Sequence, residues 1–132
     1  MQALQIVTGE AITLERRGRW RTLAGPVFFI WGGIVYQVPA GFRWNGASIP
    51  FFLWWWVSPW SAWVVLASCV HDWLYTTRTL SRRDADRILY LLLADSARRS
   101  LWRWQRYQRL VRARIIYQAV REWGDDYIGA DW

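Results

Sequence analysis

The sequence predicts an α+β fold in which a small N-terminal antiparallel β-sheet packs on two or three α-helices. Before Pro39 the apolar residues form short β-type runs divided by turn residues, whereas after Ser61 they recur at helical spacing. The chain has 132 residues, of which 54% are hydrophobic and 13 are Trp. This length and composition predict one domain with a packed core rather than a disordered tail.

The β-rich part, residues 1–50, contains four short apolar runs. They are Leu4–Val7, Ala11–Leu14, Val27–Trp31 and Ile34–Val38. Gly32 and Gly33 separate the last two runs, and both can take the positive φ of a two-residue hairpin turn. The segment from Pro39 to Pro50 is rich in Gly, Pro, Asn and Ser, so we expect it to be a site loop that exposes polar groups.

The helical part, residues 61–123, is expected to form three helices. Ser61 should cap a helix that runs through Tyr75. Ser81, followed three residues later by Asp84, should cap a second helix toward Ser96. The third helix should run from Leu101 to Trp123, before an acidic tail at residues 124–132. Its predicted buried stripe is Leu101, Trp104, Val111, Ile115 and Ala119, and its predicted solvated arc is Arg103, Arg106, Arg109, Arg112 and Arg114.

All 17 basic residues are Arg, and the formal net charge is +7. The guanidinium group suits a protein interface, an anionic membrane surface or nucleic acid, but no nucleic-acid-binding motif is present, so that last partner is not expected. The single Cys69 excludes an internal disulfide. Residues 1–10 lack the pattern of a secretory signal, and prolines interrupt the uncharged stretch from Ile49 to Val70. We therefore expect a chain made in the cytoplasm without a transmembrane helix.

One polar group of residues is suited to chemistry. His71 and Tyr75 are four residues apart and share a helix face, whereas Asp72 is turned away by about 100°. If the helices form an antiparallel pair, Asp86 can accept a hydrogen bond from one His71 nitrogen and leave the other as a base. Asp72 is then available for a cation or an Arg. A buried structural network that includes Arg82 is the alternative interpretation.

An ordered series of motifs resembles domain-of-unknown-function family 1353, which is frequent in tailed-phage and prophage genomes. The motifs are Val38-Pro39-Ala40-Gly41-Phe42, Gly46-Ala47-Ser48-Ile49-Pro50, His71-Asp72, Leu74-Tyr75, Arg82 and Ala85-Asp86. The family loop usually reads Thr-Asp-Gly-Ala-Ser, but here Trp44 and Asn45 precede Gly46. A neutral amide thus replaces an acid that could hold a metal.

His71, Asp72, Tyr75 and Asp86 are also similar in type and order to the phospholipase A2 signature. That resemblance implies that His71 activates water, that Asp86 and Tyr75 orient it, and that Asp72 holds Ca²⁺. The usual Gly-rich calcium loop is missing, so the loop containing Asn45 and Ser48 would have to replace it.

The resemblance to the phage family implies a structural or assembly protein of the virion, most readily of the tail, without a cofactor. Its partners would be other virion proteins or further copies of the chain, and its location the virion. The alternative is a phospholipase A2-like or other cell-envelope ester hydrolase with His71 as general base, for which Ca²⁺ and a membrane surface are expected. In that case Trp54 to Trp56 would anchor the protein at the membrane interface.

Overall fold

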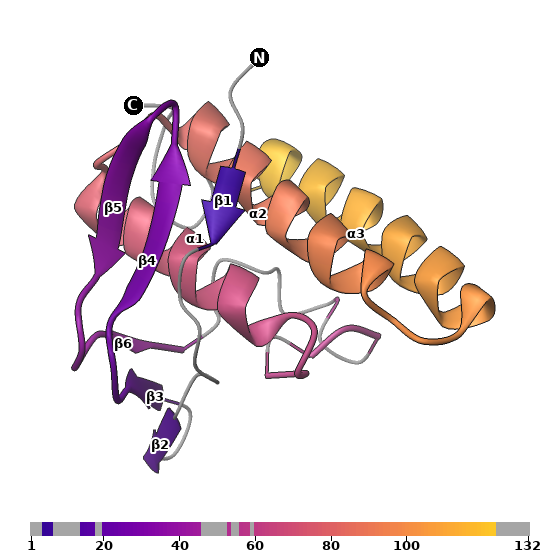
Figure 1. Cartoon of the computed structure of the whole chain (residues 1–132), viewed down its shortest axis with the longest axis horizontal. Coiled ribbons are helices and arrows are strands. Elements are labelled where there is room, and N and C mark those ends of the chain that lie inside the picture. Colours follow the sequence, from indigo (N-terminus) through magenta and orange to yellow (C-terminus); the bar gives the residue numbers. More distant parts are fainter. Residues whose placement is uncertain are drawn as a thin grey trace. The chain divides into compact units, whose positions relative to one another are not determined.

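The computed structural model divides into two compact units, residues 1–45 and residues 46–132 (Figure 1). Within them the described residues are 4–6, 14–17, 20–45, 53, 56–58 and 60–123. The N-terminal unit holds the strands and the C-terminal unit holds the helices. The predicted α+β class is therefore correct.

The described residues of the N-terminal unit form two three-stranded antiparallel sheets. The first has the order β1-β4-β5 and the second the order β2-β3-β6. Their strands are β1 (Leu4–Ile6), β4 (Val27–Trp31), β5 (Ile34–Val38), β2 (Leu14–Arg17), β3 (Trp20–Leu23) and β6 (Arg43–Trp44). Gly32 and Gly33 have φ values of 59° and 78°, as the predicted hairpin between β4 and β5 requires.

Burial alternates along β4, because successive side chains of a strand point to opposite faces. Val27, Phe29 and Trp31 are buried, and the residues between them are partly exposed. Phe29 stacks on its cross-strand neighbour Tyr36, with ring centroids 5.2 Å apart. Val27, Phe29 and Trp31 therefore belong to the buried core.

Two of the predicted runs, Val27–Trp31 and Ile34–Val38, coincide with β4 and β5. Leu4–Ile6 forms β1 and Leu14 begins β2, whereas Val7 and residues 11–13 lie outside the described residues. The strands β3 and β6 were not predicted. These strands are recognised by their backbone pairing with neighbouring strands. Their short sequences contain no continuous apolar run, so the sequence pattern gave no sign of them.

The described residues of the C-terminal unit form three helices, α1 (Val65–Thr77), α2 (Arg82–Arg98) and α3 (Arg103–Trp123), and α2 packs against both others (Figure 1). The Ser81 hydroxyl accepts the Asp84 N–H at 3.1 Å and caps α2 as predicted. Ser61 does not cap α1 through its side chain. Its carbonyl instead accepts the N–H groups of Val64 and Val65, and α1 begins at Val65, three residues later than a cap at Ser61 predicts.

The face of α3 that is buried differs from the predicted stripe. Ala113, Ile116 and Val120 are fully buried, whereas Trp104 is 68% exposed and Val111 is 40% exposed. Ala113 of α3 and Ala94 and Ala97 of α2 are also fully buried, and α2 and α3 pack against each other. Of the predicted stripe, only Ala119 is buried.

None of the described helices is both long enough and apolar enough to cross a bilayer. Within the stretch from Ile49 to Val70, helix α1 starts only at Val65, so the described part of that stretch is not one continuous helix.

Candidate functional site

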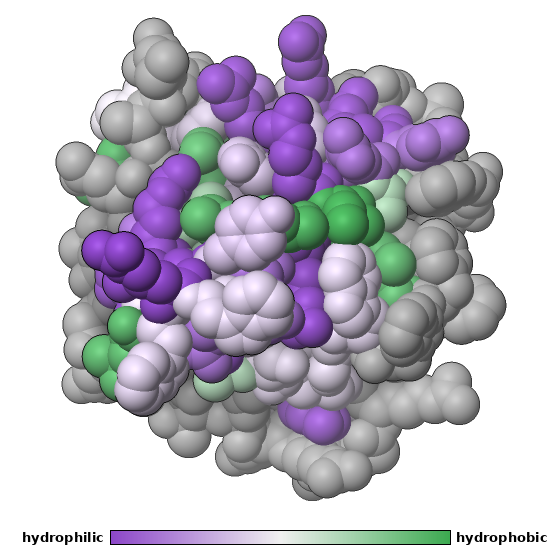
Figure 2. Space-filling view, turned by 90° about the vertical axis from the view of Figure 1, so that its right-hand side faces the viewer, coloured by the Kyte–Doolittle hydropathy of each residue, from purple (hydrophilic) through white to green (hydrophobic). Residues whose placement is uncertain are grey.

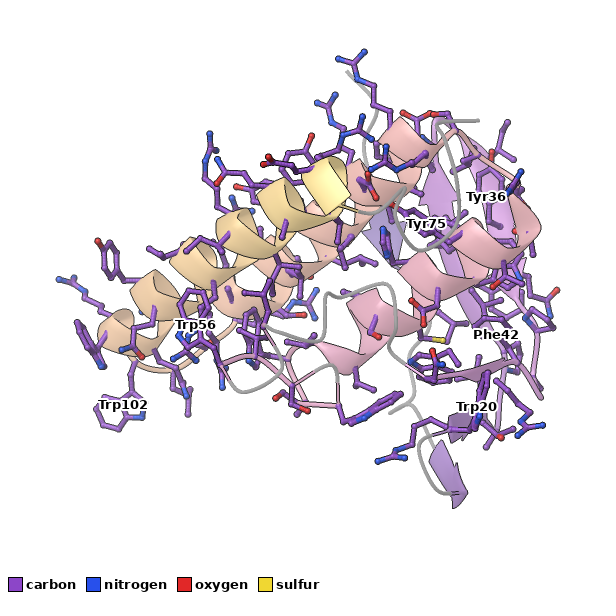
Figure 3. The ribbon with its side chains drawn as sticks, turned by 180° about the vertical axis from the view of Figure 1, so that it is seen from behind. Trp20, Tyr36, Phe42, Trp56, Tyr75 and Trp102 are labelled. Carbon is purple, nitrogen blue, oxygen red and sulfur yellow. The ribbon has the colours of Figure 1, made fainter. Side chains whose placement is uncertain are left out.

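A buried polar cluster joins α1 to α2 in the helical unit. His71 and Tyr75 lie one turn apart on α1, with ring centroids 4.1 Å apart. The Nε2 atom of His71 lies 2.7 Å from Oδ1 of Asp86 on α2, and the Tyr75 hydroxyl donates a hydrogen bond to the same oxygen. His71 and Asp86 have no solvent-exposed surface. Figure 3 shows Tyr75 projecting from α1 into this part of the helical unit. The spacing of His71, Tyr75 and Asp86 along the sequence thus predicted their contact correctly.

Two Arg side chains complete the cluster from the other side of Asp86. Nη1 of Arg121, in the last turn of α3, donates to Oδ2 of Asp86 at 2.8 Å. Arg82 lies one turn before Asp86 on α2, with its Nε 4.0 Å from Oδ2. Its Nη2 donates to the main-chain carbonyls of Val120 and Arg121 at 2.8 and 2.9 Å. Arg82 therefore neutralises the C-terminal end of α3, where helix carbonyls lack partners within the helix.

The sequence analysis missed Arg121. It lies 35 residues from Asp86, and nothing in that spacing relates the two residues. The apolar residues Ala113, Ile116 and Val120 could have indicated it, because a helix that buries this set directs the last turn of α3 toward α2. The incorrect register predicted for α3 concealed it.

The cluster keeps Asp86 ionised. Burial would raise the pKa of this carboxyl group, but the hydrogen bonds from His71, Tyr75 and Arg121 lower it below its usual range. Burial, together with the negative charge of Asp86, raises the pKa of the Tyr75 phenol. Tyr75 consequently acts as a neutral hydrogen-bond donor.

The second nitrogen of His71 has no such partner. Because the Asp86 carboxylate can only accept a hydrogen bond, it places the ring proton on Nε2 and leaves a lone pair on Nδ1. Within the described part of the chain, Nδ1 is buried and makes no hydrogen bond. The hydroxyl of Ser68, one turn earlier on α1, is buried in the same way. An imidazole oriented by a carboxylate, with one free lone pair, can act as a general base where water or a substrate reaches that nitrogen. In this structure His71 is fully buried, so a base role requires the cluster to open.

The remaining predicted site residues occupy other positions. Asp72 is buried on α1, and its main-chain carbonyl accepts a hydrogen bond from Thr76 Oγ1 at 2.8 Å. Asn45 follows β6 and belongs to the N-terminal unit. Gly46 and Ser48 lie outside the described residues.

The described residues do not assemble the Ca²⁺ site that the phospholipase resemblance implies. They contain no group of three or more His, Cys, Asp or Glu side chains that could hold a metal ion. Ca²⁺ takes six to eight oxygen ligands, which Asp72 cannot supply by itself.

Fold and site together define an α+β protein whose three helices are joined by a buried His–Tyr–Asp–Arg cluster. The model of a family described as "Protein of unknown function (DUF1353)" matches residues 30–120, and the chain belongs to this family. The matched region includes His71, Tyr75, Arg82 and Asp86 and ends one residue before Arg121. No curated protein and no solved structure matches the chain.

Proposed function

We propose that this protein is a hydrolase in which His71 acts as general base on water that attacks an ester. The observation that supports the proposal is the geometry of His71: its Nε2 is held by Asp86, and its buried Nδ1 has a lone pair without a hydrogen-bond partner in the described part of the chain. The expected substrate class is an ester of a lipid or of a cell-envelope polymer.

The proposed reaction needs one proton acceptor and one charge stabiliser. Nδ1 of His71 removes a proton from water while the water oxygen forms a bond to the ester carbonyl carbon. Asp86 stabilises the resulting imidazolium, and Tyr75 and Arg121 hold the carboxylate in place. The imidazolium then returns its proton to the leaving alkoxide as the carbon–oxygen bond of the ester breaks. The products are a carboxylic acid and an alcohol.

Two substitutions of His71 separate base catalysis from a structural role. The amide of Gln can still donate to Asp86 but cannot accept a proton, so His71→Gln should retain the fold and lose turnover. His71→Ala should lose turnover and also stability. We would measure thermal melts and the hydrolysis of p-nitrophenyl butyrate and of mixed phospholipid vesicles, with and without Ca²⁺.

Imidazole added to His71→Ala supplies a further readout, because it can restore a missing base but does not restore a purely structural contact in the same assay. Turnover that imidazole restores would support the proposal. Unchanged turnover in a folded His71→Gln variant would overturn it.

A second candidate is the virion-associated structural or assembly protein, whose role requires no turnover. The observation in its favour is that His71 and Asp86 are completely buried and that Asp86 receives groups from all three helices. In this case the cluster only stabilises the helical unit. The unmutated protein should then show no hydrolysis of any of these esters, and it should be found by mass spectrometry in purified virions, in contact with other virion proteins or with further copies of itself.

A further inference from the structure

An apolar stripe of α3 faces away from the core of the helical unit. Tyr107 is 66% exposed, and it lies on the same side of the helix as the exposed Trp104 and Val111. The turn before α3 adds Leu101 and Trp102, which are 87% and 71% exposed. Trp102 points outward at the far end of the helices (Figure 3). Together these five residues form what we call the α3 outer face.

The α3 outer face continues into a groove between α2 and α3. The groove has a volume of about 480 Å³, and its apolar wall includes Leu110, Val111 and Ile115. Arg98 of α2 and Arg114 of α3 also line it. Figure 2 looks onto this end of the molecule and shows pale aromatic and green apolar atoms bordered by purple hydrophilic atoms.

The charge of the segment that carries this surface is predominantly positive. Residues 98–123 contain eight Arg and one acidic residue, Glu122. Arg98, Arg103 and Arg114 are exposed beside the α3 outer face. Two copies of the chain joined through this face would bring these guanidinium groups together, and the repulsion opposes such a dimer. A binding partner that fits the α3 outer face has an apolar part to contact the aromatic and aliphatic side chains and negative charges to pair with the Arg side chains.

We infer that the α3 outer face binds the surface of an anionic lipid bilayer. Trp and Tyr side chains prefer the headgroup region, Leu and Val reach the acyl chains, and Arg binds lipid phosphates. The inference rests on the proposed function only in identifying the substrate, because it takes a membrane lipid as the ester that is hydrolysed at His71.

This surface differs from the anchor expected from the sequence. Trp56 is partly buried, and the guanidinium of Arg112 lies over its ring at 5.2 Å from the centroid. Trp54 and Trp55 lie outside the described residues. Among the described aromatic residues, the most exposed Trp side chains are those of the α3 outer face.

Vesicle flotation tests the inference. The full chain is mixed with vesicles of phosphatidylcholine alone or with about 30% phosphatidylglycerol, at low and high salt. We expect binding to the anionic vesicles that weakens at high salt. The triple variant Trp102→Ser, Trp104→Ser, Tyr107→Ser should lower the partition coefficient about tenfold or more. Trp20→Ser is the matched control, because Trp20 is an exposed Trp of the N-terminal unit.

The outcomes distinguish this inference from the proposed function. Hydrolysis of soluble p-nitrophenyl butyrate depends on His71 and should be unchanged in the triple variant. Absent vesicle binding, or equal binding by the triple variant and Trp20→Ser, would overturn the membrane inference and leave the hydrolase proposal standing. Concentration-dependent self-association, or capture of an acidic peptide, that the triple variant abolishes while vesicles do not bind would also overturn it. Circular dichroism confirms that each variant is folded.

Discussion

Replacing Asp86 with Asn should destabilise the protein far more than the same change at the surface of the same helix. Asp86 is fully buried and accepts hydrogen bonds from His71, Tyr75 and Arg121. An amide has one oxygen and one NH₂ group, so in either orientation one side of the substituted side chain would present a donor to a donor. The substitution also leaves the positive charge of Arg121 without its carboxylate.

The magnitude follows from the burial of the pair. Removing one partner of a buried ion pair costs about 3–5 kcal/mol. A domain of this size is stable by about 5–15 kcal/mol, so the loss is a large fraction of the total. Arg121 is 28% exposed at its side chain and can turn partly toward water, which favours the lower end of that range.

Asp95→Asn is the matched control. Asp95 is also on α2, and its carboxylate pairs with Arg99 at 3.2 Å, but both side chains are more than half exposed. Such surface pairs contribute less than about 1 kcal/mol. Urea denaturation of the two variants and the unmutated protein measures the difference. Equal losses for Asp86→Asn and Asp95→Asn would refute the structural importance that we assign to the cluster.

Three further predictions concern acid stability, the hairpin and the register of α3. The pKa of Asp86 is lowered in the folded state, so its contribution to stability is complete above its pKa in the unfolded chain, about 3.9, and is lost as the pH falls through its pKa in the folded protein. Asp86→Asn should remove this part of the acid dependence, which urea titrations at several pH values would measure. Gly33→Ala should lower the free energy of unfolding by about 1–2 kcal/mol in the same assay, because Gly33 has a φ of 78°, which a residue with a Cβ atom adopts only with strain. No atom lies within 4 Å of the added methyl group, so backbone strain alone should account for the loss. Ile116→Ala should cost about 2–5 kcal/mol and Trp104→Ala less than about 0.5 kcal/mol, and the reverse order would contradict the observed register.

The part of the site that depends on local geometry could be predicted from the sequence. His71 and Tyr75 share a face because they are four residues apart, and the Ser81 cap fixes where α2 begins. These two facts place Asp86 one turn into α2, and the further assumption that the two helices form an antiparallel pair brings it opposite His71, as observed. Arg121 could not be placed in this way, since its approach to Asp86 depends on how α3 packs against α2.

The register of α3 shows why a periodic pattern alone is insufficient. The helix carries two apolar sets, one with Trp104, Val111 and Ile115 and another with Ala113, Ile116 and Val120. The first set is larger and more apolar in area, so hydrophobicity favours burying it. The second set is buried where α3 packs on α2, and which of the two sets faces α2 is a property of the pair of helices and not of α3 by itself.

The role of Arg explains why the predicted solvated arc was wrong in part. Arg109 lies over the Trp63 ring, 5.4 Å from its centroid, and donates to Ser100 Oγ at 2.8 Å. Arg112 lies over Trp56 in the same way, and both Arg side chains are partly buried. A planar guanidinium can stack on a ring and still direct its N–H groups to an oxygen, whereas the compact ammonium of Lys cannot do both. In a chain rich in Trp, an Arg on a helix therefore does not mark the solvent-facing side. On α3 the partly buried Arg109 and Arg112 contact Trp rings, whereas Trp104 and Tyr107 face outward.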